Sequence, residues 1–175
     1  MLTGQKTLQI TSRTLAKRLP ALHENVFRAL SLLLPDELGR SDCLVSTVDD
    51  APDLYMLVME RHPYTTFLRL TYVLGEEGAQ NPNAHIRVYH DARMAEATAF
   101  SPEQGIRRLA GPMLPSRGIV ERSWRLNRAL VKWLDYVLGQ GHSQATMRRL
   151  ESIPSFLARS PMDASENPAA MFDTG

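Results

Sequence analysis

The chain has 175 residues, a length that suits one domain with tails, and its hydrophobic fraction of 43% and charged fraction of 22% are close to globular averages. These values exclude wholesale disorder. The 20 Lys and Arg residues nearly balance the 19 Asp and Glu residues, so the net charge of +1 lacks the basic excess that duplex-binding proteins show. A nucleic acid partner is left open only through a local basic patch.

A single cysteine, Cys43, excludes an internal disulfide and a zinc site built from cysteines. This cysteine usage fits a reducing compartment. No apolar run approaches the ~20 residues needed to cross a bilayer, and residues 1–8 lack the apolar core of a signal peptide. The sequence therefore predicts a cytoplasmic protein without a membrane segment.

Residues 1–14 are polar with scattered apolar positions, and we expect a flexible N-terminal arm there. Apolar residues then recur at spacings of three and four, which predicts one face of a helix that ends near Pro35 and Gly39. These residues are Leu15, Leu19, Leu22, Val26, Leu30 and Leu33. Because proline is tolerated mainly in a first turn, Pro20 predicts that the main helix starts close to it.

Five strand-like segments follow, at residues 43–48, 54–60, 64–74, 84–90 and 93–100. The links between them are short, so the strands are expected to form an antiparallel meander, since parallel pairing would need crossover helices. The segment 64–74 is the longest and richest in Thr, Tyr, Phe, Leu and Val, which predicts a central strand. Residues 75–83 are rich in Gly, Asn and Pro and predict a mobile loop.

Residues 101–119 contain three prolines and three glycines and predict an irregular connector. A second amphipathic helix is predicted from Glu121 to Leu138, with Gly139 and Gly141 ending it. Asn127 lies at the border of its apolar stripe. A buried amide needs partners, so we expect Asn127 to bond the backbone of a neighbouring strand or loop.

Residues 142–175 are expected to form a C-terminal extension, with a short helix near 145–153 and disorder after about Pro161. The fold class that follows is α+β in a single domain spanning residues 15–141. It contains an antiparallel sheet of about five meandering strands, flanked by an N-terminal and a C-terminal helix packed on one face.

The most distinctive stretch is the predicted hairpin over residues 87–97. With Asp91 in a two-residue loop, Arg87 faces Glu96 and forms a cross-strand ion pair that contributes roughly 0.2–1 kcal/mol. One interpretation is structural: the ion pair fixes the register and Asp91 forms the turn. The other is functional: Arg87, Tyr89 and Glu96 share one strand face and line a polar pocket.

Either Arg69 or Tyr72, on the preceding strand, is a candidate to join this pocket. Strand alternation places His90 on the opposite face together with Val88 and Ala95. A single site that combines His90 with the three side chains of the pocket is therefore disfavoured.

Signatures of metal, cofactor and nucleophile sites are absent from the sequence. The five histidines form no pair at metal-ligand spacing, and His85 and His90 fall on opposite strand faces. No Gly-x-Ser-x-Gly elbow is present, and Cys43 begins an apolar strand as a small buried hydrophobe. Glu76 and Glu77 flank the loop glycines and would repel phosphate. We expect no metal site and no cofactor.

Residues 105–132 form the most basic part of the chain. On the predicted helix, Arg125, Arg128 and Lys132 lie on the polar side. A solvated helix face explains these charges, and an anionic partner such as an acidic protein, RNA or a nucleotide is the alternative. Trp124 is the one aromatic residue near this side, so the stacking signal for RNA is weak.

The chain resembles the YqiB-like family of small proteobacterial proteins of unknown function over roughly residues 15–141. The matching residues are Tyr64-Thr65-Thr66, Arg87-Val88-Tyr89-His90-Asp91-Ala92, Ala95-Glu96, Asn127, Trp133-Leu134 and Tyr136. One departure is Glu121-Arg122-Ser123, which keeps only the first acid of an acidic-basic cluster in that family. The resemblance implies the domain limits and a bacterial cytoplasmic setting, and it implies no mechanism.

Three functional hypotheses follow. The leading one is a non-enzymatic binding or regulatory module that makes protein-protein or anionic-ligand contacts through the sheet face of Arg87, Tyr89 and Glu96 or through the basic helix. The second is a small enzyme that uses His90, Asp91 and Glu96 for acid-base chemistry. The third is an RNA- or nucleotide-binding protein that uses the basic helix. The sequence leaves the oligomeric state open.

Overall fold

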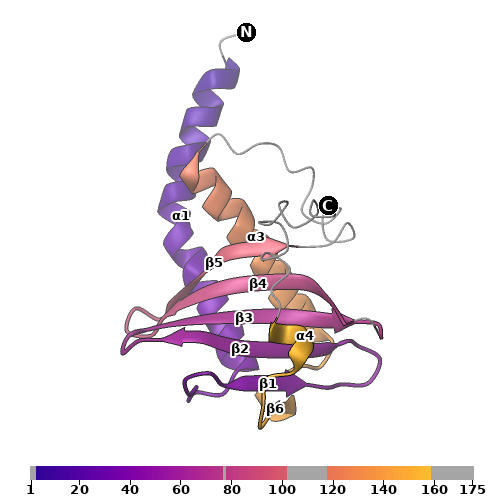
Figure 1. The fold of residues 1–175 in the computed structure, drawn as a ribbon. Helices are drawn as coiled ribbons and strands as arrows, with labels where there is room; N and C mark the ends of the chain where they lie inside the picture. The colour runs from indigo at the N-terminus through magenta and orange to yellow at the C-terminus, as the bar shows by residue number, and fades with distance from the viewer. Residues whose placement is uncertain (1–2, 77, 102–117, 159–175) are drawn as a thin grey trace, which may run out of the picture.

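The structure is a computed structural model that describes residues 3–76, 78–101 and 118–158 (Figure 1). Its elements in chain order are α1 (Thr3–Leu33), β1 (Cys43–Ser46), β2 (Asp53–Arg61), β3 (Thr65–Leu74), β4 (Ala79–Tyr89), β5 (Met94–Ser101), α3 (Ile119–Gly139), the short 3-10 helix η1 (Gln144–Thr146), β6 (Met147–Arg149) and α4 (Ser155–Ala158). The expected connector and the disorder expected after Pro161 concern residues outside these ranges.

One antiparallel sheet holds all six strands in the order β5-β4-β3-β2-β1-β6. The predicted five-strand meander is confirmed, and β3 lies in the middle of it. The strand β6 was not expected, because Met147, Leu150 and Ile153 recur every three residues as on a helix. Residues 147–149 instead pair with the edge of β1, and the Leu150 amide donates to the Cys43 carbonyl at 2.8 Å. The helix predicted over 145–153 was wrong.

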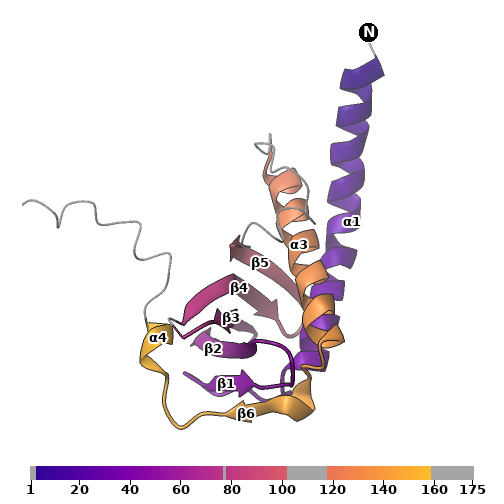
Figure 2. The same cartoon turned by 90° about the vertical axis from the view of Figure 1, so that its right-hand side faces the viewer.

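The helix α1 begins at Thr3 rather than near Pro20, so residues 3–14, which we expected to be an arm, are helical. Pro20 is exposed, so its ring meets solvent and the helix loses one backbone hydrogen bond without a clash in the core. Leu19 is half-buried and Leu22 is buried, so the helix is packed on both sides of the proline. Figure 2 shows the N-terminal part of α1 extending past α3 and the sheet.

The strand β4 begins at Ala79, so the link from β3 is shorter than the expected loop over 75–83. Pro82 lies inside this strand, which the sequence pattern argued against. The partner strand β5 ends at Ser101 opposite Asn83, so Pro82 has a strand neighbour on one side only, where a missing amide is tolerated. The Thr71 hydroxyl donates to the Pro82 carbonyl at 3.0 Å.

The helices α1 and α3 pack on the same face of the sheet, as predicted (Figure 2). Alternate strand residues point into this core. The buried residues from the central strands are Leu54, Met56, Val58, Leu68, Leu70, Tyr72, Ala84, Ile86 and Val88. Leu130, Leu134 and Val137 supply the buried stripe of α3, which confirms the amphipathic pattern read from the sequence.

The opposite face, here called the outer face, carries a second small core under α4. Cys43, Leu57 and Leu157 form it, and the Arg69 guanidinium donates to the Leu157 carbonyl. Cys43 is 2% exposed, and burial raises the pKa of its thiol, so it is the buried small hydrophobe that we expected. The edge of the Tyr55 ring meets Phe156 of α4 at 5.3 Å.

Asn127 joins α3 to the edge strand β5, as expected for a buried amide. Its Oδ1 accepts a hydrogen bond from the Ala97 amide at 2.8 Å, and its Nδ2 donates to the Ser123 carbonyl at 2.9 Å. Close by, a bulge interrupts the pairing of β5 with β4, and the Thr98 hydroxyl donates to the His85 carbonyl at 3.2 Å. The helix thus supplies an acceptor to an edge-strand amide that would otherwise be buried without one.

Replacing this amide should destabilise the fold. In Asn127→Ala the Ala97 amide loses its acceptor, so the free energy of unfolding should fall by about 1–3 kcal/mol. Urea denaturation measures the loss. The control is Asn25→Ala on the exposed side of α1, which should change stability by less than about 0.5 kcal/mol. Equal effects of the two substitutions would contradict the assignment.

Candidate functional site

The β4–β5 hairpin has the register that the sequence predicted. Arg87 pairs with Glu96 and Tyr89 with Met94. The strands end one residue earlier than a two-residue loop requires, so residues 90–93 form the turn, and Arg93 adopts a positive φ of 53°. The Arg93 amide donates to the His90 carbonyl at 3.4 Å.

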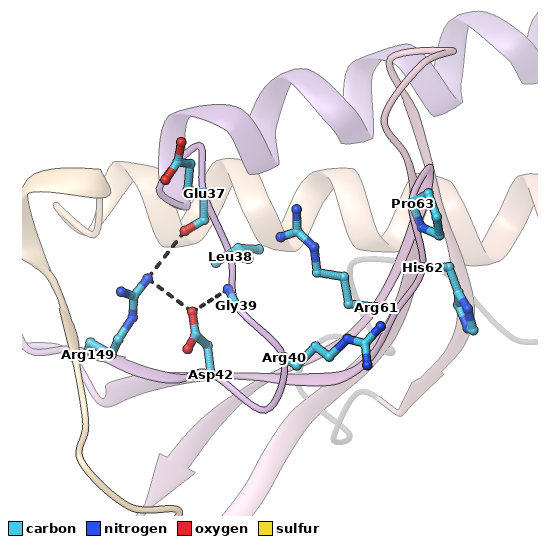
Figure 3. Close-up of a pocket in the computed structure, with 9 residues that line it drawn as sticks. All are labelled: Glu37, Leu38, Gly39, Arg40, Asp42, Arg61, His62, Pro63 and Arg149. Atoms are coloured by element: carbon cyan, nitrogen blue, oxygen red, sulfur yellow. Dashed lines mark hydrogen bonds and ion pairs between the residues drawn. The ribbon is translucent and has the colours of Figure 1, made fainter.

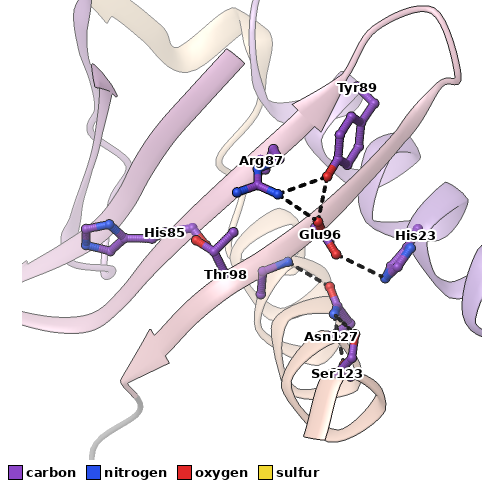
Figure 4. Close-up of polar contacts among 9 residues, drawn as sticks. His23, His85, Arg87, Tyr89, Glu96, Thr98, Ser123 and Asn127 are labelled. Atoms are coloured by element: carbon purple, nitrogen blue, oxygen red, sulfur yellow. Dashed lines mark hydrogen bonds and ion pairs between the residues drawn. The ribbon is translucent and has the colours of Figure 1, made fainter. Parts of the chain in front are cut away.

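A closed polar network lies on the outer face of this hairpin (Figure 4). The Tyr89 hydroxyl donates to Glu96 Oε1 at 2.7 Å and accepts from Arg87 Nη1 at 3.2 Å, while Arg87 Nη1 lies 3.6 Å from Glu96 Oε1. The guanidinium also stacks over the Phe67 ring at 4.8 Å. The predicted ion pair is confirmed, and the charges in this network offset one another.

The helix α1 reaches the same network through His23. Its Nε2 lies 3.9 Å from the second oxygen of Glu96 (Figure 4). Burial lowers the pKa of His23, and the Glu96 carboxylate acts against that shift. Neither Arg69 nor Tyr72 belongs to the network: the first lies under α4, and the second faces the helices, with its ring 5.6 Å from Trp133.

His90, Asp91 and Glu96 are not brought together. His90 Nε2 lies 2.7 Å from the Thr66 hydroxyl, on the helix side of the sheet, and Asp91 is exposed in the turn. Glu96 is engaged on the outer face. The geometry required for acid-base chemistry by these three groups is therefore not present.

The basic residues of α3 lie where the helical pattern placed them. Arg125, Arg128 and Lys132 are exposed on the side away from the buried stripe, and Trp124 is half-buried. Their role in binding an anionic partner stays a prediction.

A pocket that the sequence did not suggest lies at the end of the sheet near the C-terminus of α1 (Figure 3). It has a volume of about 590 Å³. Its walls come from three separate segments, namely Glu37, Leu38, Gly39, Arg40 and Asp42; Arg61, His62 and Pro63; and Arg149. We call it the Arg61 pocket. No local motif joins these residues, so only the tertiary fold reveals it.

One wall of the Arg61 pocket is held by Asp42. Its Oδ2 accepts from the Gly39 amide at 2.6 Å and lies 3.0 Å from Arg149 Nη2. Arg149 also donates to the Glu37 carbonyl at 3.3 Å, while the Asp42 carbonyl accepts from the Val58 amide at 2.8 Å. The carboxylate of Asp42 is therefore committed to the wall.

The two other arginines of the pocket differ from Arg149. Among the described residues, neither Arg40 nor Arg61 forms an ion pair or a side-chain hydrogen bond. Figure 3 shows the Arg61 side chain reaching from β2 toward Leu38, apart from the Arg149–Asp42 pair. The lining holds three guanidiniums against the carboxylates of Glu37 and Asp42, so the pocket is net positive.

Arg61 also acts on His90. Arg61 and Thr66 are cross-strand partners, and Thr66 carries the hydrogen bond to the imidazole. Burial is the main cause that lowers the pKa of His90, and the charge of Arg61 lowers it further, whereas Asp91 opposes the shift.

The comparison with family models decides the relationship of the chain. Residues 29–143 match the family described as "Protein of unknown function (DUF1249)", which is more than half of the chain. The chain belongs to this family. No curated protein and no solved structure matches it significantly. The DUF1249 match contains the hairpin network and most of the Arg61 pocket, but it stops before Arg149, β6 and α4.

A buried polar cluster also lies within or beside the DUF1249 region. Ser46 Oγ lies 2.7 Å from His142 Nδ1 and 2.6 Å from Thr146 Oγ1. His142 is 1% exposed and Ser46 is fully buried, so no substrate reaches this serine-histidine pair. The cluster joins β1 to the segment after α3, and its role is structural.

Metal and membrane features were sought in the same part of the chain. Among residues 3–76, 78–101 and 118–158, no three His, Cys, Asp or Glu side chains gather as a metal site would require. Within those ranges, no helix has the length and apolar character that crossing a bilayer demands.

Mildly acid solution should destabilise the protein. Burial is the main cause that lowers the pKa of His23, His90 and His142 in the folded state. The unfolded chain has ordinary histidines that protonate near pH ~6.5, so it binds protons first and stability falls as the pH drops below that value. Urea denaturation at a series of pH values measures the slope. His142→Gln should reduce it, and an unchanged slope would contradict the assignment to His142.

The hairpin ion pair should contribute modestly. A double-mutant cycle with Arg87→Ala and Glu96→Ala should give a coupling energy below about 1 kcal/mol, because both side chains are partly solvated and salt screens them. Thermal or urea unfolding measures each corner of the cycle. High salt should shrink the coupling, and a coupling of zero at low salt would contradict the register lock.

Proposed function

We propose that the protein is a non-enzymatic binding module that holds an anionic group of its partner in the Arg61 pocket. The observation that carries the proposal is the pair of guanidiniums, Arg40 and Arg61, that line a hollow of about 590 Å³ and have no ion-pair partner among the described residues.

Charge and geometry favour an anion there. Guanidinium groups bind carboxylate and phosphate oxygens through paired N–H donors. The Asp42 carboxylate is engaged with Arg149 and the Gly39 amide, so it does not compete for Arg40 and Arg61. Both free arginines are exposed, so water screens them and a single small anion should bind weakly.

The non-enzymatic part of the proposal is supported by the state of the hairpin groups. Arg87, Tyr89 and Glu96 bond one another, and His90 bonds Thr66 on the other face. These side chains fix the ends of β4 and β5, and their hydrogen-bonding capacity is largely used within the fold. The proposal therefore assigns them to stability and assigns recognition to the pocket.

The setting of the proposed module follows the resemblance to the YqiB-like family. It would be a bacterial cytoplasmic protein with a regulatory role, whose partner presents a phosphate or a carboxylate to the pocket. The partner is a protein or a small anionic ligand. The runner-up surface for an anion such as RNA is the exposed side of α3 that carries Arg125, Arg128 and Lys132.

The proposal predicts anion binding that depends on the pocket. Inorganic sulfate, inorganic phosphate, phosphoserine and a nucleoside monophosphate would be titrated into the isotope-labelled protein, and amide chemical shifts would report binding. Shifts should centre on residues 37–42 and 61–63, and Arg40→Gln with Arg61→Gln should weaken binding by roughly tenfold, since each lost charge-assisted contact removes about 1 kcal/mol or less at an exposed site.

The matched control is the charge reversal Arg125→Glu with Arg128→Glu and Lys132→Glu, which should leave binding unchanged. Loss of binding in this variant, with the pocket variant unaffected, would move the anion site to α3 and overturn the proposal. Absence of binding by all four anions would also overturn it. The four probes separate a free phosphate from phosphate on an amino acid or a nucleoside.

A further inference from the structure

The tips of the two hairpins lie side by side at the Arg61 pocket. The His90 amide donates to the Tyr64 carbonyl at 2.9 Å, and the His90 imidazole lies 2.7 Å from the hydroxyl of Thr66. Arg61 is the cross-strand partner of Thr66 on β2. Because paired residues project from the same face, Arg61 and His90 approach the buried Thr66 from either side.

The charges that act on His90 are few. Arg61 from β2 disfavours the imidazolium, and Asp91 from the turn favours it. Thr66 from β3 is neutral, and its hydroxyl either donates to or accepts from the ring. Protonation of His90 therefore preserves the bond to Thr66, with the hydroxyl as acceptor, and leaves the two hairpins joined.

We propose that the Arg61 pocket takes a dianionic phosphate group and that its binding is coupled to protonation of His90, so that the protein binds this group more tightly in mildly acid solution. This inference rests on the proposed function of the pocket. A dianion at Arg61 offsets the positive charge that opposes the imidazolium. By reciprocity, a protonated His90 strengthens the attraction of the pocket for the dianion by the same factor.

Two guanidiniums without carboxylate partners match a dianion better than a monoanion. One carboxylate is satisfied by one arginine fork, whereas a phosphate group offers three oxygens and about two charges. Arg40 and Arg61 come from different segments of the wall, so their donors approach the pocket from different directions (Figure 3).

The test uses sulfate as the probe, because it stays dianionic across the range where histidine titrates and therefore reports only the titration of the protein. Sulfate affinity would be measured by amide shifts at a series of pH values between about 5.5 and 7.5. For a charge screened as at a protein surface, the dissociation constant should fall roughly two- to fivefold toward the acid end. The imidazole signals of His90 should titrate at higher pH when sulfate is bound.

His62 is a second histidine on the pocket wall, so the measurement is repeated in a His62→Gln background. There the pH dependence should persist, and adding His90→Gln should abolish it while sulfate still binds. Arg61→Gln without sulfate should raise the pKa of His90, since the opposing charge is gone. His23, which contacts Glu96 and not the pocket, should titrate unchanged throughout.

The outcomes separate the two proposals. If sulfate and phosphate do not bind, the function proposed for the pocket fails. If sulfate binds with an affinity that is independent of pH and the titration of His90 does not move, binding stands and the coupling is overturned. A pH dependence that disappears with His62→Gln rather than with His90→Gln also overturns the assignment to His90.

Discussion

Alternation along β3 and β4 is the constraint on which the rest of the structure depends. One face of these strands is packed against α1 and α3, so every second side chain is committed to the core. Val88 therefore points inward, while Arg87 and Tyr89 point to the outer face. A register shift of one residue would bury the charged pair and expose the core, which is why the hairpin network and the bulk of the hydrophobic packing specify the same pairing.

The molecule treats two arginines in opposite ways. Arg87 meets Glu96, the Tyr89 hydroxyl and the face of Phe67, so its charge is used inside the fold. Arg61 sits at the end of a neighbouring strand, where the facing loop offers it no carboxylate, because Asp42 is bound to Arg149. The first arrangement stabilises a register and the second leaves a positive charge toward solvent. A shared residue type says little about role until its neighbours are known.

Features that depend on neighbours in the sequence were predictable, and features that depend on distant pairing were not. The stripe of α3, the Arg87–Glu96 register and the backbone bond of Asn127 follow from helical and strand periodicity and from the need to satisfy a buried amide. The strand β6 was missed because its partner β1 lies about a hundred residues earlier. The Arg61 pocket was missed for the same reason, since Arg149 and Asp42 meet only after the sheet is assembled.

The segment after residue 143 has a consequence for the part of the chain that defines the family. The match ends before β6 and α4, yet these elements cover the edge of β1 and the small outer core. A fragment cut to the matched range would present β1 as an open edge, which is a template for self-association. It would also bare the thiol of Cys43, now shielded by Leu157, to oxidants. The C-terminal segment thus acts as a guard against aggregation and oxidative damage.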